Sequence, residues 1–141
     1  MAEGVLIREA TPADVSTVLA LWGASRSDHA ATEATPDALE RLLADRPGAL
    51  LVAEERGAVV GALIATWDGW RGNMYRLAVR DADRRRGIGS TLVRAGEERL
   101  RRLGARRVTA LVAREDERAR ALWEAVGYPY DAVIGRHVRN L

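Results

Sequence analysis

The 141-residue chain contains no cysteine. Disulfide bonds, thiolate metal ligands and a cysteine nucleophile are therefore excluded. Long hydrophobic runs are also absent, because the longest apolar stretch, residues 58–67, falls short of the roughly 20 residues that a membrane-spanning helix needs. The first residues lack the basic segment and apolar run of a secretory signal. We therefore expect a cytoplasmic protein with no membrane partner and no metal.

Lysine is absent as well, so all 22 basic residues are arginine, and 20 acidic residues reduce the net charge to +2. The arginines between Arg94 and Arg107 alternate with Glu97 and Glu98. That mixture is typical of a solvated helix face, and it argues against a nucleic-acid partner. The length suits a single domain, residues 1–141, with a core large enough to fold unaided.

Residues 74–90 form the most informative stretch. An apolar, strand-like segment gives way to helical spacing at Ile88. Between them, Gly87 and Gly89 leave the first N–H groups of the helix uncovered, beside three consecutive arginines, Arg84–Arg86. Such a junction suits a phosphate or diphosphate, because the positive end of the helix dipole points there. The alternative is an ordinary turn between a strand and a helix.

Periodicity and turn signals predict a mixed α/β fold. The predicted elements are, in order, a strand at 5–9, helices starting at Thr11 and Thr35, strands at 49–54, 58–67 and 74–79, a helix at 88–103 ended by Gly104, a strand at 107–112, a helix opening at 114–117, and a final strand containing residues 132–134 and Val138. Short turns make the middle strands an antiparallel meander. A strand, a helix and another strand in succession favour a right-handed parallel crossover.

The spacing Arg84-x-x-Gly87-x-Gly89 resembles the R/Q-x-x-G-x-G/A signature of the GCN5-related N-acetyltransferases (GNAT), and the likeness extends over residues 5–127. It implies the GNAT fold, β-α-α-β-β-β-α-β-α-β with splayed central strands. A small bacterial enzyme of this kind would transfer an acetyl group from acetyl-CoA to a primary amine of a small metabolite, a peptide or a protein. The alternative is a catalytically silent acyl-CoA-binding sensor or regulatory module.

The resemblance also implies a set of cofactor-binding residues. The pantetheine arm would pair with the strand like an extra strand, and the loop would give backbone amides to the diphosphate. Two residues of the last helix join this set by position, one of them an aromatic residue for which core packing is the alternative. The expected cofactor-binding residues are Leu77, Ala78, Val79, Arg84, Arg85, Arg86, Gly87, Ile88, Gly89, Ser90, Asp116 and Trp123.

Transfer to an amine requires a base and an acid, and the sequence departs from the family at both places. Asn73 stands where the resemblance places a glutamate, and Trp123, whose indole N–H is too weakly acidic, stands where it places a tyrosine. We predict Asp68, between two tryptophans, as a partly desolvated base; the alternative is a structural Asp-Gly turn. We predict Tyr128 as the acid, with Tyr130 or solvent as alternatives.

Residues for the acceptor are less specific. Asp28, His29 and Glu33 follow the first predicted helix and are candidates to meet a cationic acceptor, or simply surface residues. An exposed final strand would allow a homodimer, because an unpaired strand edge can pair with a second copy.

Overall fold

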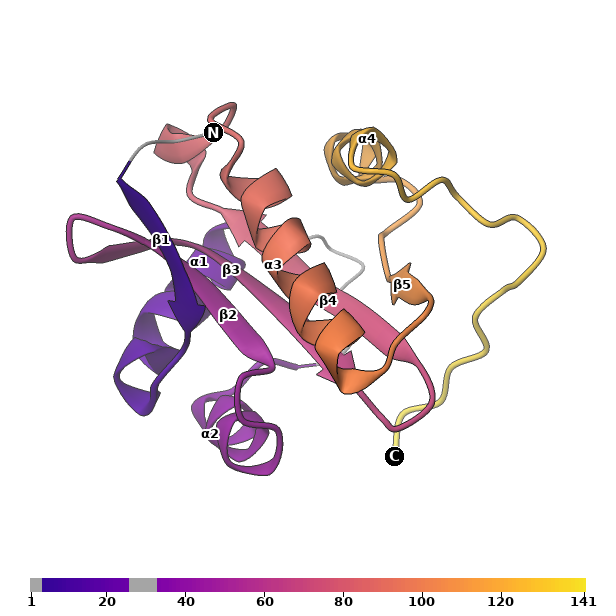
Figure 1. Cartoon of the computed structure of the whole chain (residues 1–141), viewed down its shortest axis with the longest axis horizontal. Helices are drawn as coiled ribbons and strands as arrows, with labels where there is room; N and C mark the ends of the chain where they lie inside the picture. The colour runs from indigo at the N-terminus through magenta and orange to yellow at the C-terminus, as the bar shows by residue number, and fades with distance from the viewer. Residues whose placement is uncertain (1–3, 26–32) are drawn as a thin grey trace.

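The computed structural model describes residues 4–25 and 33–141, which are built around one mixed sheet (Figure 1). The first four strands are antiparallel neighbours in chain order, and the fifth lies parallel to the fourth. The strands are β1 (Val5–Glu9), β2 (Leu50–Glu55), β3 (Ala58–Trp67), β4 (Gly72–Val79) and β5 (Val108–Ala110). This arrangement confirms the predicted meander and the parallel crossover.

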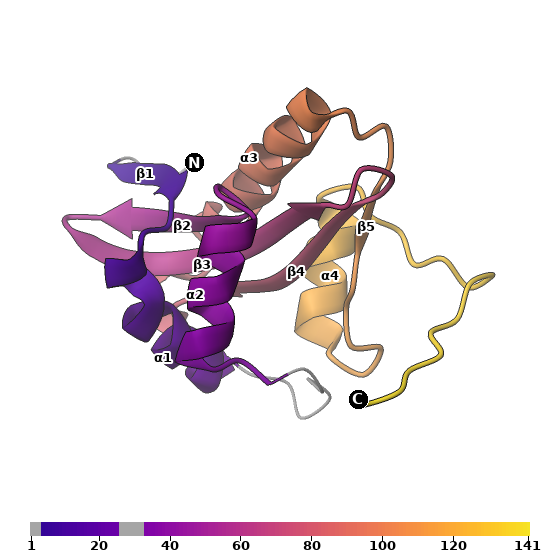
Figure 2. The ribbon, with the colours of Figure 1, turned by 90° about the horizontal axis from the view of Figure 1, so that it is seen from below.

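Helices cover both faces of the sheet. Two lie on one face and a third lies diagonally across the other (Figure 2), with two short 3-10 turns in the connections. The helices are α1 (Val15–Ser25), α2 (Pro36–Asp45), α3 (Ile88–Leu103) and α4 (Glu117–Ala125), and the 3-10 turns are η1 (Pro12–Asp14) and η2 (Asp81–Asp83). The last helix, α4, stands beyond β4 on the side of β5 (Figure 1).

The helix boundaries follow from the residues at them. Thr11 and Asp14 form a capping box at η1, directly before α1. The Thr35 hydroxyl accepts the N–H of Ala38 at 3.1 Å at the start of α2. Gly104, with φ of 114°, ends α3 in the left-handed conformation that favours glycine. All three ends confirm predictions made from the sequence.

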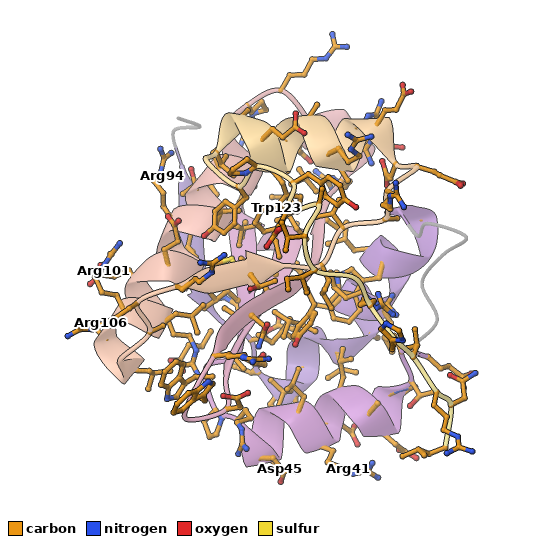
Figure 3. All side chains as sticks on the ribbon, turned by 90° about the vertical axis from the view of Figure 1, so that its right-hand side faces the viewer. Arg41, Asp45, Arg94, Arg101, Arg106 and Trp123 are labelled. Atoms are coloured by element: carbon orange, nitrogen blue, oxygen red, sulfur yellow. The ribbon has the colours of Figure 1, made fainter. Side chains whose placement is uncertain are left out.

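Each face of the sheet has its own buried cluster. One lies under α1 and α2, the other under α3 and α4. The helix α3 approaches β3 and β4 closely at Gly96, where a Cβ atom would lie 2.7 Å from Met74 Cε and 3.1 Å from Leu63 Cδ2. Outward, the same helix is polar, with Arg94 and Arg101 extending away from the core in Figure 3. The glycine thus fixes the height of α3 above the sheet.

A β-bulge interrupts β4. Tyr75 pairs with Ile64 of β3, but the next pair is Ala78 with Ala62, so two residues of β4 lie opposite one of β3. Arg76 is the first of the two, and its φ of 56° is left-handed. A side chain in this region is disfavoured by about 1 kcal/mol or more, so the surrounding contacts must hold the backbone there.

The predicted strand at 107–112 is shorter in the structure, and the predicted final strand is wrong. β5 has three residues and leaves the sheet after Ala110. Residues 132–134 form no strand, and the side chains of Val133 and Ile134 are 88% and 72% exposed. Asp131 Oδ1 accepts the N–H of Val133 at 2.9 Å, which turns the chain locally, and three-residue β5 offers little edge for pairing. The order is therefore β-α-α-β-β-β-α-β-α.

Candidate coenzyme A site

The sheet opens between β4 and β5. Their parallel pairing covers Gly72–Met74 and Val108–Ala110, and the last backbone bond, from Leu111 N–H to Met74 O, is 3.3 Å long. Beyond it, residues 75–79 pair with β3 on one edge and, within the described chain, with no strand on the other. The splayed strands expected from the sequence are therefore present, and they leave an edge where an extended ligand can form backbone hydrogen bonds.

The backbone direction on β4 decides which groups face this open edge. Arg80 N–H donates to Val60 O of β3 at 2.8 Å. Because N–H and C=O groups of successive residues alternate between the two edges of an antiparallel strand, Ala78 also faces β3, whereas Leu77 and Val79 face outward. Consistently, Val79 O accepts from Arg84 Nε at 3.4 Å outside the sheet. Two of the three predicted strand residues thus offer backbone groups to a ligand.

The N-terminus of α3 follows this edge. Gly87 precedes the helix with a left-handed φ of 77°, and no side chain caps the helix. The first helical bond runs from Thr91 N–H to Gly87 O at 3.0 Å, so the N–H groups of Ile88, Gly89 and Ser90 have no partner within the helix. These donors and the helix dipole favour an anion at this end.

The three consecutive arginines differ in their contacts. Arg86 binds Glu55 at 2.5 Å and Asp83 at 2.8 Å, and Arg84 binds Asp81 at 2.9 Å. Arg85 is exposed, and no described residue pairs with its guanidinium. Arg85 is therefore the member of the three whose charge is available to a ligand, while Arg84 and Arg86 shape the loop.

Two residues that the sequence did not single out organise this region. The Asp83 side chain, 8% exposed, accepts from Arg80 at 2.6 Å and from Arg86 at 2.8 Å, which ties the loop together. Trp22 of α1 is buried, and its Nε1–H donates to the carbonyl of Arg76 at 2.9 Å. The signal for Trp22 was available, because a buried tryptophan usually finds an acceptor for its N–H.

The expected desolvation of Asp68 is wrong. The carboxylate is exposed at the tip of the β3–β4 hairpin, and the neighbouring Trp70 is 81% exposed. The N–H groups of Arg71 and Trp70 donate to Asp68 Oδ1 at 2.6 and 2.7 Å and lower the pKa of the carboxyl below its usual range. The hairpin also joins β4 at its paired end, Gly72, away from the open edge. This geometry is that of the structural turn and does not support a base.

Tyr128 and Trp123 pack together. Their rings meet edge to face with centroids 5.1 Å apart, and Trp123 is buried under α4 (Figure 3). The Tyr128 hydroxyl donates to Glu97 of α3 at 2.7 Å. Burial, and then the bond to Glu97, raise the pKa of Tyr128 above its ordinary value, which makes it a weaker acid. Of the two roles considered for Trp123, cofactor contact and core packing, the structure supports core packing. The geometry gives no support to an acid role for Tyr128.

The remaining candidates are dispersed. The Asp116 carboxylate caps α4 by accepting the N–H of Ala119 at 3.0 Å. Tyr130 is half exposed, with the Arg114 guanidinium 5.7 Å from its ring centroid. Glu33 is exposed beyond the N-terminal end of α2, and Asp28 and His29 lie outside the described residues. None of these described groups lies on the open half of β4.

The GNAT acetyltransferase family model matches residues 16–128. The chain belongs to this family. An acetyltransferase of Pectobacterium atrosepticum is 31% identical over 116 residues, covering 82% of this chain and 81% of the relative. Ard1 of Thermoplasma volcanium superposes with a TM-score of 0.78 at 23% identity, covering 88% and 82% of the two chains. Ribosomal-protein-alanine N-acetyltransferase of Brucella melitensis superposes with a TM-score of 0.76 at 21% identity, covering 99% of this chain and 100% of the neighbour.

Membership of the GNAT family makes the protein an acetyltransferase, and the neighbours show that the fold is theirs. Within residues 4–25 and 33–141, no helix is both long and apolar enough to cross a membrane. Over the same residues, no three potential ligands come together that could hold a metal ion.

Proposed function

We propose that the protein is an N-acetyltransferase that takes its acetyl group from acetyl-CoA and gives it to a primary amine. The observation that supports this most strongly is the meeting of an unpaired strand edge with an uncapped helix start. The outward groups of Leu77 and Val79 lead directly to the free N–H groups at the start of α3. An elongated ligand with amides at one end and phosphates at the other matches that order.

Each part of coenzyme A fits a different part of this surface. The pantetheine arm carries two amides and would extend the sheet by bonding to Leu77 and Val79. The diphosphate would accept from the N–H groups of Ile88, Gly89 and Ser90, and Arg85 would add a charge. One such helix end contributes only about 0.3 to 2 kcal/mol, so the amides must act together.

Acetyl-CoA, when bound, supplies a thioester whose carbonyl carbon forms a bond to the amine nitrogen while its bond to sulfur breaks; the nitrogen loses one proton and the sulfur gains one. With the pantetheine arm along residues 77–79, the reacting carbon would be held where β4 and β5 separate. This point adjoins the bulge at Arg76. The outward N–H group of Leu77 is suited to the oxygen that becomes negative during the transfer.

Among the described residues the geometry positions no base or acid, so we assign both proton transfers to water. β4 carries no carboxylate, Asp68 is held in its turn, and Tyr128 is a weakened acid. The ammonium form of an ordinary amine, with a pKa of about 10.4, does not attack, so kcat/KM is expected to rise with pH toward the pKa of the acceptor. Asp68→Asn is expected to leave both the rate and this pH profile unchanged. If the variant instead lost or shifted the rise of kcat/KM with pH, Asp68 would again be the candidate base.

The acceptor is a primary amine of a small metabolite or of a peptide or protein. The Brucella neighbour is named for transfer to the alanine of a ribosomal protein, but its 21% identity shows a shared fold alone. A panel that includes diamines, amino acids and peptides with free N-termini therefore covers both classes.

Calorimetry with coenzyme A, followed by release of free thiol from acetyl-CoA across this amine panel, tests the proposal. We expect binding, and thiol release that requires one class of amine. Binding without turnover across the whole panel would instead identify an acyl-CoA sensor, the alternative favoured by the lack of a positioned base and acid among residues 4–25 and 33–141. No binding of coenzyme A would refute both.

A further inference from the structure

We propose that Trp22 is a positioning residue for acetyl transfer. It lies on α1, outside the strand and loop that would hold coenzyme A, and acts through the backbone of Arg76. The inference rests on the proposed function and adds to it a residue that sets the rate rather than the affinity for the cofactor.

The contact is buried and specific. Trp22 is 4% exposed, and its indole N–H donates to the Arg76 carbonyl at 2.9 Å. The Arg76 guanidinium lies over the same indole, with its central carbon 5.5 Å from the ring centroid. One aromatic side chain therefore contacts both the backbone and the side chain of this residue.

Arg76, the residue that Trp22 contacts, has a backbone conformation that is unfavourable for a residue with a side chain. Arg76 has a left-handed φ of 56°, which β4 uses to place two residues opposite one of β3. An unfavourable backbone conformation persists only where surrounding contacts determine it, and the indole N–H is such a contact. Without it, the carbonyl of Arg76 could rotate back toward an ordinary strand geometry.

The position of the bulge explains why this contact concerns the reaction. Regular pairing with β5 ends at Met74, and the bulge follows within two residues. The peptide group between Arg76 and Leu77 carries both the carbonyl that Trp22 holds and the Leu77 N–H that faces the open edge. Because these atoms lie in one rigid plane, fixing the carbonyl also fixes the direction of the N–H.

Removal of the indole N–H tests this directly. Trp22→Phe keeps an aromatic ring in the core and loses the donor, and β-(3-benzothienyl)alanine at position 22 keeps the shape and replaces the N–H by sulfur. We expect kcat to fall about five- to tenfold in both, as for one lost hydrogen bond, with the Kd for coenzyme A changed less than about twofold. The amide chemical shift of Leu77 should change in both variants, because the orientation of its peptide group changes.

Trp67→Phe is the matched control, since Trp67 is a half-buried tryptophan on β3 beside Gly104, away from the bulge. It should lower Tm without lowering kcat at a temperature where all variants are folded. If the isosteric variant at position 22 keeps the parent kcat and the parent chemical shift of the Leu77 amide, the inference is overturned. Failure of the parent to bind coenzyme A would refute the proposed function instead, and the Leu77 amide shift would still test the contact.

Discussion

The two halves of β4 serve different purposes. Gly72–Met74 pair with a strand on both edges and lie under α3. Met74 is fully buried there, and its side chain packs against Gly96 of α3. The other half, residues 75–79, has a strand on one edge only and contains the bulge at Arg76. One half anchors the sheet, and the other leaves backbone groups for a ligand.

The two ends of α3 repeat this contrast. Its C-terminus is closed, because Gly104 N–H donates to Arg101 O and the Trp67 ring packs nearby. Its N-terminus, after Gly87, leaves its first N–H groups uncapped. A left-handed glycine stands at both ends of α3. The glycine at the C-terminus ends the helix with a backbone hydrogen bond, whereas the glycine at the N-terminus leaves the first N–H groups uncapped. The direction of the helix decides which end suits an anion, because the N-terminus presents N–H donors and the positive end of the dipole, whereas the C-terminus presents carbonyl oxygens.

The largest expected effect separates these two glycines. Gly87→Glu forces a side chain into the left-handed region and places a carboxylate where the diphosphate would lie. We expect the Kd for coenzyme A to rise by about a hundredfold or more, since strain, bulk and repulsion act together. Calorimetry measures the change.

Gly104→Glu is the matched control, because it puts the same side chain at a similar φ at the other end of α3. It should destabilise the fold by about 1 kcal/mol and leave the Kd of the folded protein unchanged. Equal losses of affinity in the two variants would mean that Gly87 acts only through folding, and the functional contrast between the ends would disappear.

A second prediction concerns the paired half of β4. Gly96→Leu would push a side chain into Met74 and Leu63, so α3 must rise from the sheet. We expect the free energy of unfolding to drop by about 1 to 3 kcal/mol, as in other overpacked cores, measured by urea denaturation. Provided that the protein is folded, the Kd for coenzyme A should rise far less than in Gly87→Glu, because Gly96 lies about two turns beyond the helix start. A large loss of affinity at unchanged stability would contradict the division of β4.

The smallest effect distinguishes neighbouring arginines. Arg85→Ala should raise the Kd for coenzyme A about two- to fivefold, an effect that shrinks as salt rises. Arg86→Ala should affect stability, because Arg86 hydrogen-bonds Glu55 and lowers the pKa of that carboxyl. Because the pKa of Glu55 is lower in the folded protein than in the unfolded chain, the ion pair stabilises the fold at pH values above the ordinary pKa of a glutamate. This stabilisation is lost as the pH falls through the lowered pKa of the folded state.

The stability difference between Arg86→Ala and the parent should therefore be present at pH 7 and decline as pH drops below the ordinary range of a glutamate. Thermal unfolding between pH 3 and 7 provides the measurement. The assignments would be reversed if Arg86→Ala weakened binding more than Arg85→Ala and showed no pH-dependent difference in Tm.

The sequence predicted what depends on local pattern. Thr35, Gly104 and the limits of α3 follow from capping and periodicity, and the glycine–arginine loop follows from its spacing. The bulge at Arg76 had no such signal, because arginine does not mark a left-handed residue; the conformation depends on Trp22, distant in the chain. Equally, three adjacent arginines cannot be told apart until the fold brings Glu55 beside one of them.

The predictions that the structure does not support share a cause. Residues 132–134 have a strand-like pattern, yet a strand requires a partner edge, and short β5 provides almost none. Asp68 beside two tryptophans suggested desolvation, but Trp70 extends into solvent and the carboxylate bonds to its own turn. Tyr128 has the chemistry of an acid, and only the packing against α3 shows Glu97 as its partner. In each case the missing information was tertiary.

The central claim, that the open half of β4 and the start of α3 bind one ligand, is tested most directly by amide chemical shifts during titration with coenzyme A. The account predicts that the amides of Leu77, Val79 and residues 88–90 shift together with one Kd, while those of Gly72–Met74 and the C-terminal turn of α3 stay in place. Shifts confined to the paired half of β4, or independent titration of the strand and the helix end, would contradict it.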